Sequence, residues 1–344
     1  MSQSGYYYIS HAGSLLHFPS LAEALTADRQ AGYLWLDFCE PNRSDLEALI
    51  EPLGLHPLSI EDCFDENQIP KIEDYPQNAF ILINSFNYVQ KSLAIAEVDF
   101  FIGANYLVTV SPLDLEQRRV LKDVDRIAGH DMANACLGPA YLAHILLDWV
   151  VDNKFAAIES IEEELNESED LILADHAKFD PSELVHLRRE MLGLRKSLFH
   201  EREILMKICR KDCLFIPDKA IIYYRDIYDH LTKFFELTEA SRDLVTSLME
   251  MYLSIVNNQM NKYANQTNAT VRRLTFITTI FMPLTLLAGI GGMSEWSMMT
   301  GPENWRIAYP LFLLGMIVLG AANYYFLVGF EKRRQKRETT LEIK

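Results

Sequence analysis

The sequence has 344 residues, a formal net charge of −16 and a mean hydropathy close to zero. A chain this acidic repels a phosphate backbone, which excludes a nucleic-acid partner. The five cysteines are an odd set, and the first ten residues have neither the basic nor the apolar region of a signal peptide, so we expect reduced thiols and no cleaved leader. No glycine-rich phosphate loop, nucleophile elbow or zinc-protease helix occurs, so we do not expect an enzyme.

Residues 1–135 mix strand and helix signals and are expected to form a cytoplasmic domain. Runs rich in aromatic and β-branched residues predict strands at Tyr6–Ser10, Tyr33–Phe38, Ala79–Val89 and Glu97–Ser111, the last folding back at Gly103–Asn105. Helical turns are expected at Pro19–Asp28, Ser44–Leu53 and Pro57–Asp62. The pattern alone indicates an α+β or α/β fold.

Residues 136–218 are expected to form a helical region of the same cytoplasmic part. The stretch Glu159–Asp170 sets a heavily acidic face against an apolar one, whose residues are Ile158, Ile161, Leu165 and Ile172. The acidic face is either a solvated surface or a place for metal capture. The nine histidines form no ligand-spaced cluster, and Cys209 with Cys213 would need further partners to bind zinc.

Residues 219–270 are expected to form a stalk helix. Neither Pro nor Gly occurs between Pro217 and Pro283, so one helix can continue for over about 60 residues, far longer than a globular helix and typical of a bundle in an oligomer. The segment NNQMNKYANQTN, residues 257–268, replaces the apolar positions just before the membrane. Its amides either contact a hydrated ion in a ring or set the register of the bundle.

Two uncharged segments, Leu274–Ser294 and Ile307–Phe330, are each able to cross a bilayer, which requires about 20 apolar residues as a helix. We expect a first, pore-lining span at 271–294, an extracytoplasmic loop at 295–306, a second span at 307–330 and a basic cytoplasmic tail at 331–344. Basic residues flank both spans on the same side, at Arg272 and Arg273 and in the tail. The positive-inside rule therefore places both termini in the cytoplasm of a multi-pass membrane protein.

A polar line follows the first span and the stalk before it. Steps of three and four residues connect Asn257, Asn261, Ala264, Asn268, Val271, Thr275, Thr278, Met282, Thr285 and Gly289. Because a single helix cannot enclose water, such a line indicates a symmetric ring of copies around an axial pore. The alternative is that the threonines bond to their own helix and the small residues only let helices approach.

Three stretches of the chain resemble the CorA metal-ion transporters. They are Tyr252–Ser294, which contains FMPLTLLAGIGGMS, together with Gly54–Ile83 and Glu97–Ser111. The resemblance implies an α+β membrane protein with an N-terminal α/β/α cytoplasmic domain and a very long stalk helix that continues into the first of two transmembrane helices. It further implies a funnel-shaped homopentamer in the cytoplasmic (inner) membrane, in contact with lipid, that transports a divalent cation, Mg²⁺ first.

The family signature Gly-Met-Asn is altered here to Gly292-Met293-Ser294. In the family, the Asn oxygens form a ring that holds the incoming hydrated cation. Ser294 offers a shorter side chain with a hydroxyl, so the ring would be wider and differently polar. The zinc-transporting ZntB branch also departs at this motif. A Zn²⁺, Co²⁺ or Ni²⁺ transporter, or a non-conducting membrane sensor or scaffold of the same fold, therefore remains an alternative.

The resemblance also assigns roles to individual residues. Gly292, Met293 and Ser294 form the metal-binding mouth, assisted by Glu295 and Glu303 in the loop. The pore-lining residues are Asn257, Asn261, Asn268, Thr275, Thr278, Thr285 and Gly289. Val271, Leu274 and Met282 match apolar constrictions, which gate by excluding water or else only pack helices together. The transported Mg²⁺ or Zn²⁺ is the only ion required and no cofactor is expected; a regulatory cation site near the acidic helices is implied without a defined residue.

Overall fold

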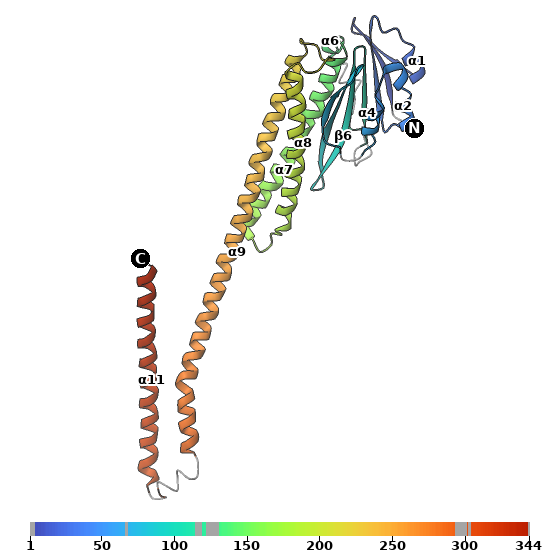
Figure 1. The fold of residues 1–344 in the computed structure, drawn as a ribbon. Helices are drawn as coiled ribbons and strands as arrows, with labels where there is room; N and C mark the ends of the chain where they lie inside the picture. Colours follow the sequence, from blue (N-terminus) through green and yellow to red (C-terminus); the bar gives the residue numbers. More distant parts are fainter. Residues whose placement is uncertain are drawn as a thin grey trace. The chain divides into compact units, whose positions relative to one another are not determined.

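A computed structural model describes residues 4–65, 68–113, 119–121, 131–292, 301 and 304–342 (Figure 1). The chain divides into two compact units, Met1–Tyr252 and Leu253–Lys344, which are described separately below. The predicted mouth residues Met293 and Ser294 and the loop residues Glu295 and Glu303 lie outside the described residues.

The first unit contains a seven-stranded sheet in the order β2-β1-β3-β7-β6-β5-β4. The strands are β1 (Gly5–Ser10), β2 (Leu15–Phe18), β3 (Gly32–Cys39), β4 (Lys71–Asp74), β5 (Asn78–Val89), β6 (Ser92–Gly103) and β7 (Tyr106–Ser111). Only the β3–β7 pair is parallel. The four predicted strand regions are all present, and the predicted fold-back at Gly103–Asn105 separates β6 from β7.

The hairpin of β5 and β6 is the longest element of the sheet, with 12 residues in each strand. Its turn residues Gln90 and Lys91 both have positive φ, at 52° and 62°, as a type I′ turn requires. Neither residue is Gly or Asn, so the usual signal of this turn is missing from the sequence. The register pairs Asn84 with Glu97 and places Asp99 between Leu82 and Val110.

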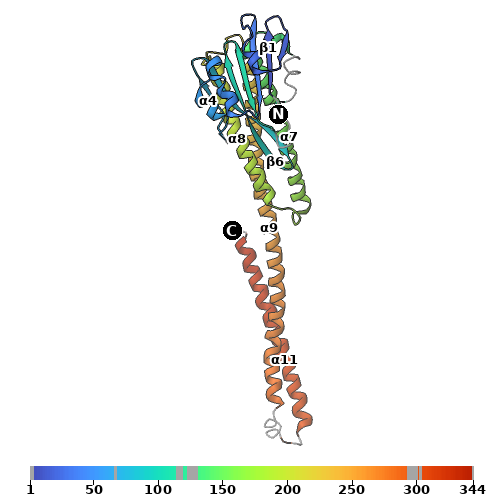
Figure 2. The same ribbon diagram turned by 90° about the vertical axis from the view of Figure 1, so that its right-hand side faces the viewer.

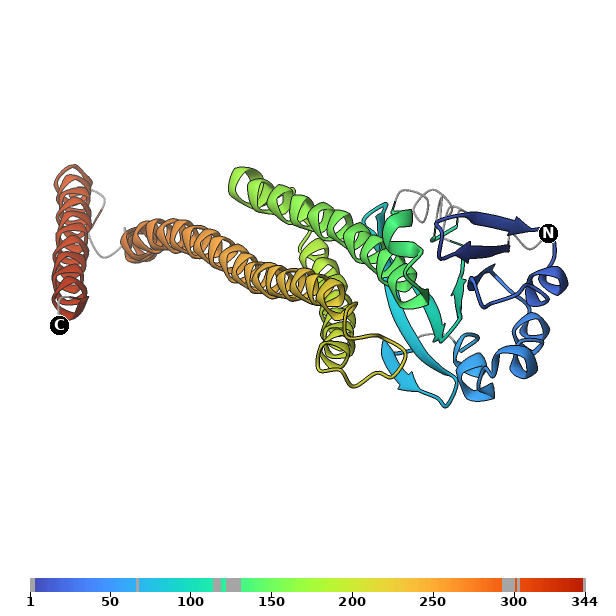
Figure 3. The ribbon, with the colours of Figure 1, turned by 90° about the horizontal axis from the view of Figure 1, so that it is seen from above.

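Short helices cover one face of the sheet: α1 (Leu21–Leu25), α2 (Arg43–Glu47), α3 (Ile50–Leu53) and α4 (Pro57–Asp62). Apolar residues of these helices and of the strands form one buried cluster, which includes Leu36, Phe80 and Phe101 from the sheet. Ser20 caps α1 because its hydroxyl accepts from the N–H of Glu23. Figure 3 shows this helical layer beside the sheet.

The other face is covered by the short helix α6 (Met132–Ala135) and by three long helices, α7 (Pro139–Asp175), α8 (Ser182–Cys209) and the beginning of α9 (Ile221–Gly291). Figures 1 and 2 show α7, α8 and this part of α9 running side by side. The apolar face predicted for the acidic stretch is confirmed, because Ile158, Ile161, Leu165 and Ile172 are all buried. The arrangement confirms the α/β/α layers implied by the resemblance.

The helix α9 runs from Ile221 to Gly291, over 71 residues, with Pro283 inside it. This length confirms the long helix predicted from the absence of Pro and Gly. Its first part buries Tyr224, Ile227 and Leu231 within the first unit. The second unit contains the rest of α9, from Leu253 onward, and the whole of α11 (Trp305–Glu342). Both helices contain a segment long and apolar enough to cross a membrane, and neither segment is buried within the chain.

Candidate functional site

The predicted polar line lies along one side of α9 in the second unit. Its amide and hydroxyl positions, together with Gly289 and Gly292, are all exposed in the single chain; these positions are Asn257, Asn261, Asn268, Thr275, Thr278 and Thr285. At about 100° per residue, they fall on one flank of the helix. The line is therefore continuous along the helix, and the described side chains of the second unit do not cover it.

The threonine hydroxyls of this line donate to their own helix. Thr275 Oγ1 donates to the carbonyl of Val271 at 2.9 Å, and Thr285 Oγ1 donates to that of Phe281 at 2.8 Å. Thr278 Oγ1 lies 3.1 Å from the carbonyl oxygen of Leu274. Because each hydroxyl uses its only hydrogen in this way, the oxygen lone pairs that remain can only accept. Outward-facing acceptors suit the hydrogens of a hydrated cation.

The opposite side of α9 packs against α11. The half-buried residues of α9 in this region are Phe276, Ile280, Pro283, Leu284, Leu287 and Gly291. The corresponding residues of α11 are Ala308, Phe312, Met316, Gly320, Asn323, Leu327 and Val328. A Cβ at Gly291 would lie 2.8 Å from the ring of Phe312, so this contact requires glycine. The two helices thus form a hairpin whose packing leaves the polar line uncovered.

The three predicted gate residues are large apolar side chains on or beside the same line. Val271 is 54% exposed, Leu274 61% and Met282 72%. Met282 and Gly289 line one shallow groove on α9 together with Thr278 and Thr285. Such exposed apolar groups require either lipid or another protein surface to cover them.

A different group of ligands lies in the first unit. Asp148 and Asp152, one turn apart on α7, meet His230 of α9, with one ligand atom from each lying within 4.8 Å of the others. His230 Nδ1 is 3.8 Å from Asp152 Oδ1. Both His230 Nδ1 and Asp148 Oδ1 are enclosed by protein and have no hydrogen-bond partner. Carboxylate oxygens and an imidazole nitrogen are ligands that Mg²⁺, Co²⁺ and Zn²⁺ accept to different degrees.

The electrostatics of this group favour a cation. Burial raises the pKa of Asp148 to about 6, and the negative charge of Asp152 adds to the rise. A nearby carboxylate, Asp226, contributes in the same direction, whereas His230 opposes it. A bound cation would remove this repulsion between carboxylates.

This group was not predicted from the sequence, in which the histidines show no ligand spacing, because Asp148 and Asp152 lie on a different helix from His230. A signal was present, since Asp148 with Asp152 and Asp226 with His230 are each spaced i, i+4. What the spacing could not show is that these two helix faces meet. Cys209 and Cys213 do not belong to any group of three close metal ligands among the described residues.

Comparison with known proteins shows what the chain is similar to. The family model described as "CorA-like Mg2+ transporter protein" matches residues 30–334. The putative metal ion transporter YfjQ of Bacillus subtilis is 32% identical over 304 residues, which cover 87% of this chain and 90% of that protein. The cobalt/magnesium transport protein CorA of Thermotoga maritima is 30% identical over 306 residues, which cover 87% of this chain and 82% of that protein.

A solved structure also shares the fold. The complete structure of the CorA magnesium transporter from Methanocaldococcus jannaschii superposes with a TM-score of 0.69, covering 94% of this chain and 96% of that one. The sequence identity over this superposition is 20%. The likeness therefore extends over both units.

Proposed function

The chain belongs to the CorA family of metal-ion transporters, and from this premise we propose that it carries divalent cations, Mg²⁺ first, across the cytoplasmic membrane through an axial pore of a homo-oligomer. Members of the family are transporters rather than enzymes, in agreement with the prediction that the chain is not an enzyme. The transported ion is the substrate, and no cofactor is required.

The observation that carries the proposal is the uncovered polar line on α9. Since α11 packs against the opposite side of the helix, the line is available to other copies of the chain. Copies arranged around an axis would enclose rings of Thr275, Thr278 and Thr285 oxygens. Five copies, as the family resemblance implies, would place five acceptors in each ring.

The path of the ion follows the order of residues along α9. The cation enters at Gly292, Met293 and Ser294, where Glu295 and Glu303 raise its local concentration. It then passes the hydroxyl rings, with apolar rings of Met282, Leu274 and Val271 between them that close the path by excluding water. The amides of Asn268, Asn261 and Asn257 contact its water shell at the cytoplasmic end, which avoids complete dehydration of Mg²⁺.

The basic residues set the orientation. Arg272 and Arg273 and the tail after Glu331 place both termini on the cytoplasmic side. The acidic first unit then lies in the cytoplasm, where its charge attracts the arriving cation. In this location the group of Asp148, Asp152 and His230 is exposed to the cytoplasmic concentration of divalent cations and serves as their binding site on this side.

The identity of the ion depends on the mouth. Ser294 replaces the amide of the family signature with a shorter hydroxyl, so a ring of five would be wider. We assign Mg²⁺ first because the rings behind the mouth contain only oxygen acceptors and no thiol or imidazole. One alternative is a transporter of Zn²⁺, Co²⁺ or Ni²⁺. The other is a membrane sensor that does not conduct ions.

A flux assay on the full-length protein in proteoliposomes tests the proposal. Indicator dyes inside the vesicles report entry of Mg²⁺, Co²⁺, Ni²⁺ and Zn²⁺. We expect saturable Mg²⁺ entry that Thr278→Val lowers several-fold, because valine has the shape of threonine without the acceptor. Thr270→Val is the matched control, since Thr270 is an exposed threonine of α9 that points about 100° or more away from Asn268, Val271 and Thr275 on the line.

Three outcomes would contradict the proposal. Equal effects of the two valine variants would exclude the polar line as the path. Entry of Zn²⁺ but not of Mg²⁺ would show that the transported ion is Zn²⁺. A well-folded oligomer that passes none of the four ions would favour the sensor, and Ser294→Asn would then show whether the altered mouth is the cause.

A further inference from the structure

A separate set of acceptor groups surrounds a cavity of about 610 Å³ within the first unit. The cavity lies between α4 and the residues after it, the strands β5, β6 and β7, and α8. Polar residues on its lining include Asn84, Asp99, Glu97 and Ser197. None of these residues belongs to the polar line of α9 or to the group around His230.

Asp99 occupies a position that would ordinarily be apolar. It lies on β6 between Leu82 and Val110 in the sheet, both of which are buried in the apolar cluster, and it is itself only 3% exposed. Its Oδ1 has no hydrogen-bond partner in the described part of the chain. A buried carboxyl oxygen without a donor is costly to maintain, so this position points to a ligand that supplies one.

Asn84 also faces this cavity and, like Asp99, has one oxygen without a hydrogen-bond partner among the described residues. Its Nδ2 donates to Ser197 Oγ at 2.7 Å, but its Oδ1 has no partner, and the residue is 6% exposed. The hydrogen bond to Ser197 determines which end of the amide remains open. The cavity therefore contains two unpartnered oxygens from neighbouring strands, one from an amide and one from a carboxyl group.

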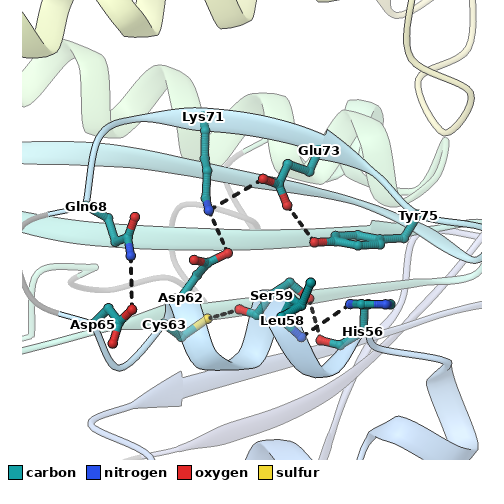
Figure 4. Close-up of polar contacts among 10 residues, drawn as sticks. All are labelled: His56, Leu58, Ser59, Asp62, Cys63, Asp65, Gln68, Lys71, Glu73 and Tyr75. Carbon is teal, nitrogen blue, oxygen red and sulfur yellow. Dashed lines mark hydrogen bonds and ion pairs between the residues drawn. The ribbon is translucent and has the colours of Figure 1, made fainter.

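The neighbours of Asp99 in the described part of the chain leave its Oδ1 without a donor, although the thiol of Cys63 also lies within hydrogen-bond reach of the carboxyl group. Figure 4 shows that Lys71 binds Asp62, at 2.7 Å, and also Glu73, at 3.5 Å. The thiol of Cys63 donates to the carbonyl of Ser59 at 3.2 Å. Lys71 is thus already engaged with other carboxylates.

The charges that face the cavity are mainly negative. Glu40, Asp65, Glu97 and Asp99 line it, against Lys196 as the one basic residue among its described lining residues. An anionic ligand is therefore excluded. A ligand that satisfies both oxygens must carry positive charge and N–H or O–H donors.

The geometry does not favour a bare metal ion. Among the described residues, Asp148, Asp152 and His230 are the one group of three His, Cys, Asp or Glu side chains whose ligand atoms converge within 4.8 Å. The acidic groups around Asp99 are farther apart. The wall also has an apolar part, which includes Phe64, Ile69, Pro70 and Leu113. Both features suit a larger ligand with an alkyl portion.

We propose that this cavity binds a small organic cation with a primary ammonium group, which donates to Asp99 Oδ1 and Asn84 Oδ1 while its alkyl part lies against the apolar wall. The ammonium group has three donors and can satisfy both oxygens at once. Burial raises the pKa of Asp99 to about 8, so at pH 7 the empty site holds the carboxyl mainly protonated. Binding of the cation ionises Asp99 and releases its proton.

Isothermal titration of the full-length protein in detergent at pH 7 tests the proposal, with 1,4-diaminobutane and ethylamine as probes. Two buffers of different ionisation enthalpy measure the protons released. We expect saturable binding of at least one amine with release of about one proton per site. Asp99→Asn keeps the shape of the side chain but removes its charge and its proton, so binding and proton release should both be lost.

A second variant keeps the test independent of Asp99. Gly193 lines the cavity on α8, and a Cβ there would have Ile95 Cδ1 as its nearest neighbour, at 3.8 Å. Gly193→Met therefore fits the fold and fills the cavity, and it should abolish amine binding although Asp99 is retained. Asp170→Asn, which changes an exposed carboxylate of α7 away from the cavity, is the control and should leave amine binding unchanged.

Several results would overturn the proposal. Absence of binding by both amines to the wild-type protein would leave the cavity as a water-filled space. Undiminished amine binding to Asp99→Asn or to Gly193→Met would place the amine elsewhere. Binding of Mg²⁺, titrated in parallel, that is lost with Asp99→Asn while neither amine binds would identify the site as a metal site.

Discussion

Lys154 of α7 and Glu201 of α8 form an ion pair in which neither side chain is exposed to solvent. Glu201 Oε1 also accepts from the backbone N–H of Asn84 at 2.9 Å and from Ser197 Oγ at 3.1 Å. The ammonium nitrogen of Lys154 lies 4.9 Å from the ring centroid of Phe86. One buried network therefore connects α7, α8 and β5, and it adjoins the cavity through Asn84 and Ser197.

Removing one charge of this pair should destabilise the first unit. Lys154→Met leaves Glu201 ionised and unpaired in the interior, and we expect a cost of about 3–5 kcal/mol in the free energy of unfolding. Chemical denaturation of the full-length protein, followed by circular dichroism, measures it. The double variant Lys154→Met with Glu201→Gln should recover much of the loss, because no charge remains buried and the amide oxygen can still accept from the N–H of Asn84.

The exposed pair Arg43–Glu47 provides the control, with side chains 58% and 51% exposed. Arg43→Gln should change the free energy of unfolding by less than about 1 kcal/mol. A loss of the same size in Arg43→Gln and in Lys154→Met would show that burial of the pair is not what makes it important.

A polar side chain at the apolar gate should increase conduction. Met282 is 72% exposed on the polar line, and Met282→Ser would allow water to remain in a ring that otherwise excludes it. We expect faster Mg²⁺ entry into proteoliposomes. Ile277, 55% exposed but on a different side of α9, provides the control, and Ile277→Ser should leave the rate unchanged. Slower Mg²⁺ entry with Met282→Ser would show that Met282 is not part of the gate.

Binding of a divalent cation at Asp148 should weaken in acid. The pKa of Asp148 is raised to about 6 by burial, so the carboxylate ligand is lost as the pH falls through this value. Titration calorimetry with Mg²⁺ at pH 7.5 and pH 5.5, run at equal ionic strength, should show lower affinity at the lower pH.

The control for this prediction is Asp170→Asn, which changes an exposed carboxylate of the same helix outside the group. It should preserve both the affinity and its pH dependence, whereas Asp148→Asn should lower the affinity and flatten the dependence. An affinity that does not differ between pH 5.5 and 7.5 in the wild-type protein would show that Asp148 is not a ligand.

Asp99 should make the stability of the protein decrease with pH. Its pKa in the folded chain, about 8, lies above its ordinary value of 3.8, so between these values the folded chain holds a proton that the unfolded chain has released. Stability is therefore lost as the pH rises through this window, at most by about 1.4 kcal/mol per pH unit. Asp99→Asn should remove this contribution and be more stable than the wild type at pH 8.

Denaturation curves at pH 5, 6.5 and 8 measure the difference between the two proteins, in the absence of amines. The advantage of Asp99→Asn should grow with each step. A constant difference across the three pH values would mean that Asp99 is ionised throughout.

Much of the fold could be predicted because it depends on local physics. The run without Pro or Gly after Pro217 predicted one long helix, and α9 continues to Gly291 as a single element. The strands β2 and β4 were not predicted, since each has four residues and is specified mainly by its partner strand. The beginning of β6 was also missed, because the turn at Gln90 and Lys91 lacks the usual Gly or Asn.

The sequence by itself determined the membrane hairpin, the long helix and the polar line, since length, hydropathy and a period of three and four residues act within one segment. It also indicated the family through stretches from Gly54 to Ser294. Only the tertiary structure decided that Asp148 and Asp152 meet His230, and that α11 leaves the Thr278 side of α9 uncovered. The burial of Asp99 without a donor was likewise visible only in the fold. These features depend on which distant segments pack together, and no local pattern encodes that choice.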